Sequence, residues 1–373
     1  MFQFHSKKKL FNRQRADFSL GLTAFGLMGF GVVMIYSASV FVGERYFGDP
    51  RVFYNKQLIS LVIALVVWVF IQQIDYHFWK KFAGIILLVS FFLLLLVFLF
   101  EPRGGSHSWI FIGSFQFQPS EFTKLALIIY LASWFDKRKS EIQSFKAGFI
   151  PFVTIMGVIA MLLLAQPDLG TFTIIFFIAV LLYFFAGAPL THFALGGALS
   201  AVAFWITVWQ SDYRRARLLT FLDPSQDTLG SAYHIQNILI AIGSGGWWGI
   251  GFGQSRQKRL FLPEPHTDSI FPVIVEELGF VRALIVLLAI LFVIIRAYRI
   301  ALLAPDEFGK LLAIGIATWI TVQTAVNIAA MLGLIPLTGI PIPFVSYGGS
   351  SLIMLGAALG ILLNISKQIR KEN

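Results

Sequence analysis

The sequence predicts an all-α integral membrane protein, a single polytopic domain (1–373) with about ten transmembrane helices. Three observations support this fold class: an apolar composition, a succession of apolar segments of spanning length, and a one-sided distribution of basic residues. Of the 373 residues, 57% are hydrophobic and 13% are charged, whereas soluble domains hold roughly 45–50% apolar and about 25% charged residues. So large an apolar excess cannot be buried in one globular core, and part of it must face lipid.

The first apolar segment follows a basic N-terminal stretch. It extends over about 18–42, which is too long for the core of a signal peptide, and no clear cleavage site accompanies it. We therefore predict a first membrane span with its basic end in the cytoplasm. The chain contains no cysteine, which excludes disulfides, thiolate metal ligands and a cysteine nucleophile.

Further apolar segments follow along the chain. A helix needs about 20 residues to span a bilayer, and the segment at 121–135 is short for this purpose. No soluble domain fits between the spans, and the one long connection, 210–268, is predicted to be a large extracytoplasmic loop between spans seven and eight. The predicted spans are 18–41, 57–74, 82–100, 121–135, 147–165, 169–187, 190–209, 269–297, 308–332 and 346–365.

Basic residues set the orientation, because cytoplasmic loops carry an excess of lysine and arginine. They gather ahead of the first span, in the connections after spans two, four and eight, and in the last residues of the chain. The short loops on the other side hold only Arg45, Arg51, Lys56 and Arg103. Both termini are therefore predicted to be cytoplasmic, with tails at 1–17 and 366–373.

The long outer loop is basic, against this orientation rule. Long loops need not follow this rule, so one interpretation is that the basic residues of this loop have no function. The other is an anionic ligand at the outer leaflet, most simply a phosphate or pyrophosphate. The loop cations are Arg214, Arg215, Arg217, Arg256, Lys258 and Arg259.

Ionisable residues inside spans indicate function, because lipid makes them costly. Ser120 is a candidate N-cap of the fourth span, and Glu121 suits the positive end of that helix. A spacing of three places Glu121 and Lys124 on one helical face, either as an internal ion pair or as part of a site. Asp168 lies in a Pro- and Gly-flanked turn, where it is either a capping residue or a functional carboxylate.

The densest polar segment is LPEPHTD at 262–268, at the outer mouth of the eighth span. Asp268 is either a helix cap or a general base, because a carboxylate near apolar walls gains proton affinity by desolvation. Glu276 and Glu277 follow within the span. Arg282 is five or six residues further on, which is not on their helical face, so we expect it to find another partner.

These residues do not form a familiar metal motif. Glu264, His266 and Asp268 are close in sequence, and His107 and His234 could approach from other loops, but HExxH and paired-histidine spacings are absent. The sequence requires no cofactor. A loosely held Mg²⁺ or another divalent cation that bridges an aspartate and a pyrophosphate is compatible with it.

Two glycine-rich segments indicate close backbone approach. The segment 243–253 is too dense in glycine for an ordinary helix, and 341–351 combines prolines and glycines just before the last span. Non-helical backbone is tolerated at membrane depth only where protein groups or water in a cavity form hydrogen bonds with it. We therefore expect a re-entrant or broken segment there. Our hypothesis is that both segments and Asp268 form the walls of one outward-facing cavity.

Seven short motifs follow one another over nearly the whole chain. They are YSAS at 36–39, QPSEF at 118–122 with Lys124, QPDLG at 166–170, IGSGG at 242–246, LPEPHTD at 262–268, EELG at 276–279 and PFVSYGGSS at 343–351. Each is weak alone, and the set is highly specific. Together they resemble the SEDS family (shape, elongation, division and sporulation), to which FtsW and RodA belong.

The resemblance implies a peptidoglycan glycosyltransferase that polymerises lipid II at the outer face of the bacterial plasma membrane, with Asp268 as the catalytic residue. It also implies a class B penicillin-binding transpeptidase as partner, alongside other divisome or elongasome membrane proteins; no nucleic acid is expected. FGDP at 47–50, DYHFW at 75–79 and FLDP at 221–224 look more like FtsW than RodA, which favours division over elongation. The candidate substrate- and pyrophosphate-binding residues are Glu121, Lys124, Arg214, Arg215, Arg217, Arg256, Lys258, Arg259, His266, Ser346, Gly348 and Gly349, with Asp168, Glu276 and Glu277 as supporting residues.

Three positions depart from the family pattern. Ser108 precedes Trp109 where many members carry arginine, which puts in doubt any phosphate-binding role of that loop. Val275 stands where glycine is usual, and Arg282 where a small residue is expected. Arg282 either alters packing or supplies a cation that the loop has lost.

Two other classes of protein fit some of these features. A lipid II flippase would also have many spans and buried charge, but the outer position of Asp268 and of most surplus cations favours chemistry on one side. A non-catalytic division scaffold is a third hypothesis, which the charges within the spans oppose because a scaffold need not carry their cost.

Overall fold

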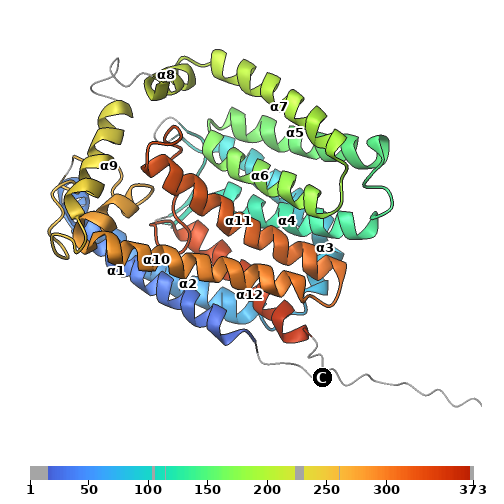
Figure 1. Ribbon diagram of the computed structural model, residues 1–373, viewed down its shortest axis with the longest axis horizontal. Helices are drawn as coiled ribbons and strands as arrows, with labels where there is room; N and C mark the ends of the chain where they lie inside the picture. The colour runs from blue at the N-terminus through green and yellow to red at the C-terminus, as the bar shows by residue number, and fades with distance from the viewer. Residues whose placement is uncertain (1–15, 103–105, 114, 223–230, 260, 370–373) are drawn as a thin grey trace, which may run out of the picture.

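The computed structural model describes residues 16–102, 106–113, 115–222, 231–259 and 261–369. Ten long helices correspond one to one with the ten predicted spans, so the predicted fold class is confirmed (Figure 1). They are α1 (Phe18–Phe47), α2 (Val52–Ile71), α3 (His77–Leu96), α4 (Pro119–Lys137), α5 (Ile150–Ala165), α6 (Leu169–Phe185), α7 (Leu190–Trp209), α10 (Ile270–Leu302), α11 (Glu307–Met331) and α12 (Gly349–Gln368).

The connections contain structure that the sequence did not predict. The long loop folds into two helices, α8 (Asp212–Leu222) and α9 (Ser231–Gly245), which lie at the end of the bundle away from the C-terminus (Figure 1). A two-stranded antiparallel hairpin, β1 (Ile110–Ile112) and β2 (Phe115–Phe117), precedes α4. Short turns η1 (Val97–Leu99) and η2 (Phe145–Phe149) complete the described elements.

Eight of the described helices are long and apolar enough to cross a membrane. The two predicted spans outside that set are α6, which is apolar but has only 17 residues, and α4. The charges on α4, among them Glu121 and Lys124, lower its hydropathy. With these two helices, ten spans bring both ends of the chain to one side: the Asp17 amide donates to Ser366 Oγ at 3.1 Å, beside the end of α12.

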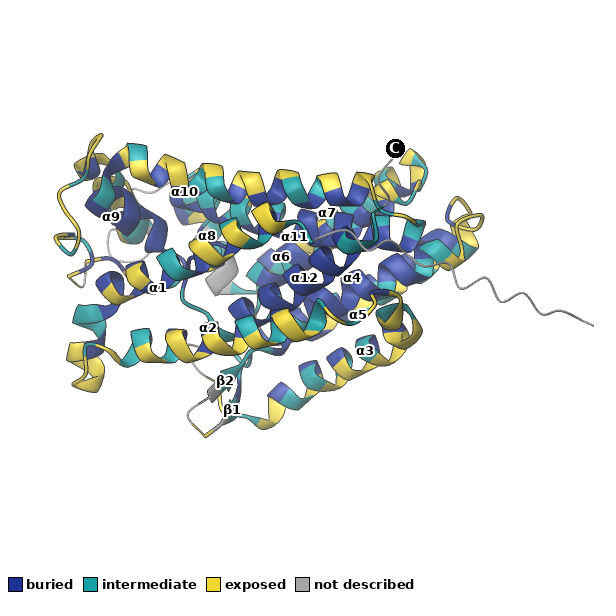
Figure 2. Cartoon of the chain, turned by 90° about the horizontal axis from the view of Figure 1, so that it is seen from below, coloured by how far each residue is buried: buried dark blue, intermediate teal, exposed yellow. Residues whose placement is uncertain are grey.

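The core of the bundle is α12, which is buried along nearly its whole length against α2 and α4. Figure 2 shows α4, α11 and α12 buried in the middle of the bundle, flanked by helices whose outer faces are exposed. Gly356 and Gly360 permit the α2 contact, because a Cβ at either position would lie within 3 Å of backbone oxygens of α2. In contrast, α7 has only His192 and Val208 buried among its described side chains. The helix is attached near its start, where His192 Nδ1 lies 2.7 Å from the Tyr183 hydroxyl.

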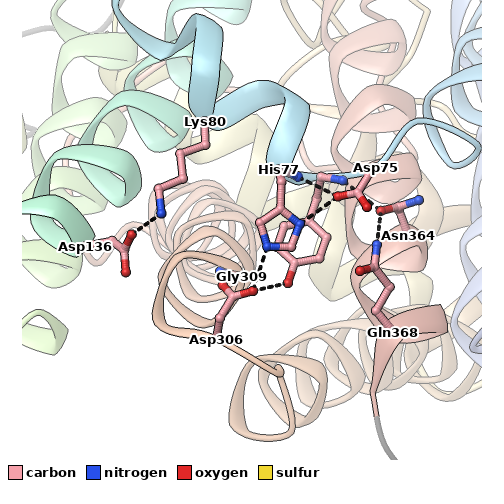
Figure 3. A network of polar contacts seen from close by, with 9 residues as sticks. Asp75, His77, Lys80, Asp136, Asp306, Gly309, Asn364 and Gln368 are labelled. Atoms are coloured by element: carbon pink, nitrogen blue, oxygen red, sulfur yellow. Dashed lines mark hydrogen bonds and ion pairs between the residues drawn. The ribbon is translucent and has the colours of Figure 1, made fainter. Parts of the chain in front are cut away.

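We call the side that carries the chain ends the termini end, and the opposite side the loop end. At the termini end a polar network joins the α2–α3 turn to the start of α11 (Figure 3). Asp306 caps α11 by accepting from the Gly309 amide at 2.7 Å, and it also accepts from the Tyr76 hydroxyl. His77 lies between two carboxylates, with Nε2 2.9 Å from Asp306 and Nδ1 2.7 Å from Asp75. These contacts hold the α2–α3 turn against the start of α11.

At the loop end α10 is broken at Gly279, whose φ of 83° lies in the left-handed region. The segment after α9 packs backbone to backbone on this break. The Ile250 and Gly251 amides donate to the Glu276 and Glu277 carbonyls, each at 3.0 Å. In the other direction, the Phe280 amide donates to the Gly246 carbonyl at 2.9 Å. The break thus serves as a docking point for the long loop.

The close backbone approach predicted for the glycine-rich segment 243–253 is confirmed, and the backbone that approaches it belongs to α10. Gly243 and Gly245 are helical residues of α9 rather than helix breakers, and the irregular backbone begins at Gly246. Gly245 is needed because a Cβ there would lie 2.1 Å from the Val275 carbonyl oxygen. None of this segment lines the cavity described below, so the hypothesis that it forms a cavity wall is wrong.

Replacing Gly279 by alanine should unfold or strongly destabilise the protein. The new Cβ would lie 2.3 Å from the Gly249 nitrogen, and the left-handed backbone would be strained. We expect a loss of about 2–4 kcal/mol, measured as a lower thermal unfolding midpoint in detergent. Gly197→Ala on α7 is the matched control, because a Cβ there meets nothing within 4 Å. Equal midpoints for both variants would contradict the docking role of the break.

Candidate active site

A cavity of about 720 Å³ opens at the loop end of the bundle. Its walls come from the start of α2, the hairpin segment before α4, the start of α4, the α5–α6 turn, the segment before α10 and the α11–α12 connection. In the ten-span topology all of these lie on the same side of the membrane. Segments from six parts of the chain therefore meet in one polar cavity.

The start of α4 supplies a buried ion pair to this cavity. Lys124 Nζ lies 2.7 Å from Glu121 Oε1, which confirms the predicted pairing. The same ammonium donates to Gln323 Oε1 at 3.0 Å and lies over the Trp319 ring. Glu121 Oε2 is buried and has no hydrogen-bond partner among the described residues. A buried carboxylate oxygen without a partner is costly, so this oxygen is available to a ligand donor.

The N-cap of α4 is Gln118, followed by Pro119, so the prediction that Ser120 caps the helix is wrong by two residues. Proline at the first helical position supplies the required φ and has no N–H to leave unpaired. Ser120 instead turns its hydroxyl toward Asp168 Oδ2 at 3.4 Å. The start of α4 and the α5–α6 turn therefore contact each other through polar side chains.

Asp168 is both a capping residue and a cavity residue. Its Oδ1 accepts from the Thr171 amide at 3.0 Å, so the helix-capping interpretation is confirmed. The side chain also lines the cavity. Burial raises the pKa of this carboxyl above its usual range, and the neighbouring Glu121 adds to the effect. This wall of the cavity is thus acidic and rich in hydrogen-bond acceptors.

The part of the α11–α12 connection at 340–346 is mostly buried but not helical, as predicted for a broken segment. Its polar backbone is satisfied by side chains of neighbouring helices. Asn327 Nδ2 donates to the Ile340 carbonyl at 2.7 Å, and Gln323 Nε2 to the Pro341 carbonyl at 2.9 Å. Ser346 Oγ closes a tight turn by accepting from the Ile342 amide. Ser346 is buried, and the next residues, 347–351, line the cavity.

The segment before α10 places Asp268 beside the cavity. Thr267 lines the cavity and donates from Oγ1 to Asp268 Oδ1 at 3.0 Å. On the other side, Asn327 Nδ2 donates to the Asp268 carbonyl at 3.0 Å. The N-cap of α10 is Ser269, and no side-chain hydrogen bond caps that helix. The helix-cap interpretation of Asp268 therefore has no support in the geometry.

Two titratable groups of this segment have shifted acidities. Burial raises the pKa of Asp268 to about 6, although hydrogen bonds from Thr267 and the backbone oppose the rise. Burial lowers the pKa of His266 to about 4, so this imidazole is neutral at neutral pH. The His266 ring packs against Phe53 at 4.1 Å and Tyr347 at 5.3 Å between ring centroids. Its Nδ1 is buried and has no partner among the described residues.

The basic residues of the long loop do not gather in the cavity. Lys258 is buried and donates to Glu277 Oε1 at 2.5 Å and to Ser37 Oγ at 2.8 Å. Arg256 and Arg259 are exposed, and Arg259 lies over the Phe41 ring. Arg215, on α8, lies over the Trp209 ring. The side chains of Arg214 and Arg217 are outside the described part of the structure.

Glu276 and Glu277 anchor the long loop to α10. Ser255 Oγ donates to Glu276 Oε2 at 2.5 Å, and the Arg256 amide donates to Glu276 Oε1 at 3.0 Å. Ser37 donates to Glu277 Oε2 at 2.7 Å and so brings α1 into the same network. The side chains of Glu276, Glu277, Ser255 and Ser37 are all buried. The network fixes the segment that leads to Asp268.

Arg282 finds its partners in the backbone, as expected from its spacing. Its Nη1 donates to the Trp248 carbonyl at 3.0 Å and to the Leu278 carbonyl at 3.3 Å. It therefore helps to cover the break in α10 and does not line the cavity.

Lys56 is a cavity residue that was not among the candidates predicted from the sequence. Lys56 lines the cavity, is half-buried, and forms no ion pair with a carboxylate of the described residues. Its spacing contained a signal, since Phe53, Lys56 and Ser60 repeat at helical intervals and all three line the cavity. Ser108 also lines it. Among the described residues, no group of three or more His, Asp or Glu side chains is arranged to hold a metal ion.

This geometry defines a class: a polytopic membrane protein with a cavity at one end of its bundle, walled by helix starts and non-helical segments that carry charged and polar side chains. Residues 18–371 match the model of the FtsW/RodA/SpoVE family, described as a cell cycle protein family. The chain belongs to this family. It is 41% identical over 357 residues to stage V sporulation protein E of Bacillus subtilis (strain 168), covering 95% of this chain and 98% of that one.

Other relatives agree in sequence and in fold. The probable peptidoglycan glycosyltransferase FtsW of Geobacter sulfurreducens (strain DL-1 / KN400) is 39% identical, with 96% of each chain covered. A chain from a peptidoglycan synthase complex, studied for its coordination of polymerization and crosslinking, matches with a TM-score of 0.78 at 29% identity, covering 94% of this chain and 97% of that one. The rod shape determining protein RodA of Thermus thermophilus matches with a TM-score of 0.71 at 26% identity, covering 96% and 98%.

A double-mutant cycle tests the structural role of Lys258. Lys258→Met alone leaves Glu277 buried without its cation, and we expect a loss of about 3–5 kcal/mol in stability. Lys258→Met combined with Glu277→Gln removes both charges and should recover a large part of that loss. The measurement is the free energy of unfolding in detergent for the single and double variants. Strictly additive losses would contradict the coupling.

Proposed function

We propose that this chain is a peptidoglycan glycosyltransferase that polymerises lipid II, the disaccharide-peptide carried on a polyprenyl pyrophosphate. The observation that carries the proposal is the position of Asp268. This carboxylate adjoins a polar cavity at the loop end, does not cap α10, and has a pKa raised to about 6 by burial. The relative named as a probable peptidoglycan glycosyltransferase FtsW supports the assignment.

The chemistry is a single displacement. The Asp268 carboxylate accepts the proton of the acceptor 4-hydroxyl as that oxygen attacks the anomeric carbon of the donor sugar. The bond from that carbon to the pyrophosphate oxygen breaks, and polyprenyl pyrophosphate leaves with the electron pair. The anomeric configuration inverts. A second, acidic carboxyl group of the glycosidase type is not needed, because pyrophosphate is a good leaving group without protonation.

A general base contributes about 10²–10⁴-fold to such a reaction, and the remainder comes from orientation and from charge stabilisation. The acidic wall of Glu121 and Asp168 suits sugar hydroxyls and amides, which donate hydrogen bonds. The leaving pyrophosphate needs donors and cations, which we place at the opposite wall. Glu276 and Glu277 act at a distance, by holding the loop that leads to Asp268. A divalent cation would need ligands from the substrate as well as from the protein.

The same proposal implies a cellular location and a partner for this chain. The chain lies in the bacterial plasma membrane with both termini in the cytoplasm and the cavity at the outer face. The structural match to a chain of a peptidoglycan synthase complex supports a penicillin-binding transpeptidase as partner. The match to proteins named FtsW, together with the motifs at 47–50 and 75–79, supports a role in division over elongation.

Asp268→Ala should abolish polymerisation. Loss of the base should reduce the rate by about 10²–10⁴-fold. The measurement is glycan-strand formation from purified lipid II by the reconstituted protein, with and without the transpeptidase partner. Asp49→Ala is the control, because Asp49 is an exposed carboxylate in the α1–α2 turn of the same end. Equal activity in Asp268→Ala and wild type would remove Asp268 as the base. If wild type makes no polymer even with the partner, a leaflet-exchange assay would test the flippase alternative.

The pH dependence provides an independent test of the same base. The reaction needs the ionised carboxylate, and the pKa of Asp268 is raised to about 6. Below this pH, kcat/KM should fall about tenfold per pH unit, and above it kcat/KM should level off. The measurement is initial rate against pH at low substrate concentration. A level profile down to pH 4.5 would contradict a base with this acidity.

A further inference from the structure

We propose that Lys56, the N-terminus of α12 and His266 Nδ1 form an anion site that binds the diphosphate of the lipid-linked substrate. This proposal rests on the proposed function, because it names the part of that substrate which the site takes. Among the loop cations whose side chains the structure describes, Arg215, Arg256, Lys258 and Arg259, none lines the cavity, whereas Lys56 of α2 does.

Lys56 is suited to this role and Lys124 is not. Both ammonium groups belong to cavity-lining residues. Lys124 is neutralised by Glu121, and a further donor bond goes to Gln323. Lys124 also adjoins the acidic wall that contains Asp168, where an anion would be repelled. Lys56 is half-buried and has no carboxylate partner among the residues the structure describes.

The start of α12 adds backbone donors beside Lys56. Residues 348–351 line the cavity, and no side chain caps α12. The first amides of a helix have no intrahelical acceptor and carry the positive end of the helix dipole, which makes them anion binders. Residue Gln57, the neighbour of Lys56, accepts from the Gly348 amide at 3.2 Å and donates to the Ser346 carbonyl. α2 therefore holds the start of α12 next to Lys56.

His266 provides an independent sign of a ligand at the same place. It is only 3% exposed and lines the cavity, yet its Nδ1 has no partner among the described residues. Its ring contacts Phe53, one turn before Lys56 on α2, and its carbonyl accepts from the Tyr347 amide at 2.9 Å. A neutral imidazole with a proton on Nδ1 would donate to an anion there. The carboxylate of Glu264, which also lines the cavity, lies 3.8 Å from Nε2 and is 67% exposed.

The depth of this site favours a lipid-linked diphosphate over a soluble one. Lys56 is in the second turn of α2, only about 6 Å along the helix axis from its start. Because the proposed topology places the start of α2 at the outer side of the membrane, Lys56 would lie near the headgroup level, where the phosphates of a membrane-anchored substrate are found. The sugars attached to the diphosphate would then extend toward Asp268 and the acidic wall.

The test is binding of polyprenyl diphosphate to the purified full chain in detergent, by calorimetry and by fluorescence of the tryptophans, which include the cavity residue Trp109. Lys56→Gln should weaken binding about 10- to 100-fold, because it removes a charge-assisted hydrogen bond. Lys56→Arg should retain most of the affinity. Arg51→Gln is the matched control, since Arg51 is an exposed cation at the start of α2 that does not line the cavity.

Unchanged affinity in Lys56→Gln, with a normal unfolding midpoint, would overturn the site. If Lys56→Gln does not fold, the same binding measurement is made with Lys56→Met, which keeps the aliphatic part of the side chain and removes the charge. Tight, Lys56-dependent binding of inorganic diphosphate without binding of polyprenyl diphosphate would overturn the lipid-linked source. Wild type that binds polyprenyl diphosphate through Lys56 yet makes no glycan would leave the site standing while the proposed function fails. If the wild-type chain polymerises lipid II but Lys56→Gln binds polyprenyl diphosphate as tightly as wild type, the proposed function stands and the anion site fails.

Discussion

The structure depends on one constraint: a backbone N–H or C=O group that is buried in lipid or in protein must find its partner within the chain. Helices satisfy this requirement for their own backbone, and the segments that are not helical have to satisfy it by other means. At the loop end, the α11–α12 connection is held by side chains of Asn327 and Gln323 from α11 and of Gln57 from α2. These amides allow irregular backbone to enter the bundle beside the cavity, because they form hydrogen bonds with its carbonyl and N–H groups.

Whether a feature could be predicted depended on how far apart in the sequence the interacting residues lie. Apolar segments of spanning length predicted the ten long helices, since a long apolar run is a local signal in the sequence. The charges at Glu121 and Lys124 were also informative, because an ion pair three residues apart lies on one helical face. Partners distant in sequence left no such signal. Nothing local indicates that Lys258 pairs with Glu277 and Ser37, or that α8 and α9 form in the long loop.

Glycine was the residue most open to misinterpretation. A cluster of glycines indicates that something approaches the backbone closely, but it does not say what approaches. At Gly349 the neighbour is Ser60 at the edge of the cavity, whereas at Gly245 it is the backbone of α10. Both patterns look alike in the sequence, and only one of them belongs to the site. The cavity residues missed in the sequence, above all Lys56, are ordinary surface types whose role comes from the position of α2 relative to α12.

The contrast between α7 and α12 has a consequence for how this chain can vary. Most described side chains of α7 face outward, where any alkyl or aromatic group is accepted equally well by acyl chains, so exchange among apolar residues there costs little. On α12, Gly356 and Gly360 touch the backbone of α2, and even a methyl group has no room. Apolar substitutions should therefore accumulate along α7 during evolution, whereas the sequence of α12 should change little. The rate of sequence change at a position should then increase with its distance from the bundle axis.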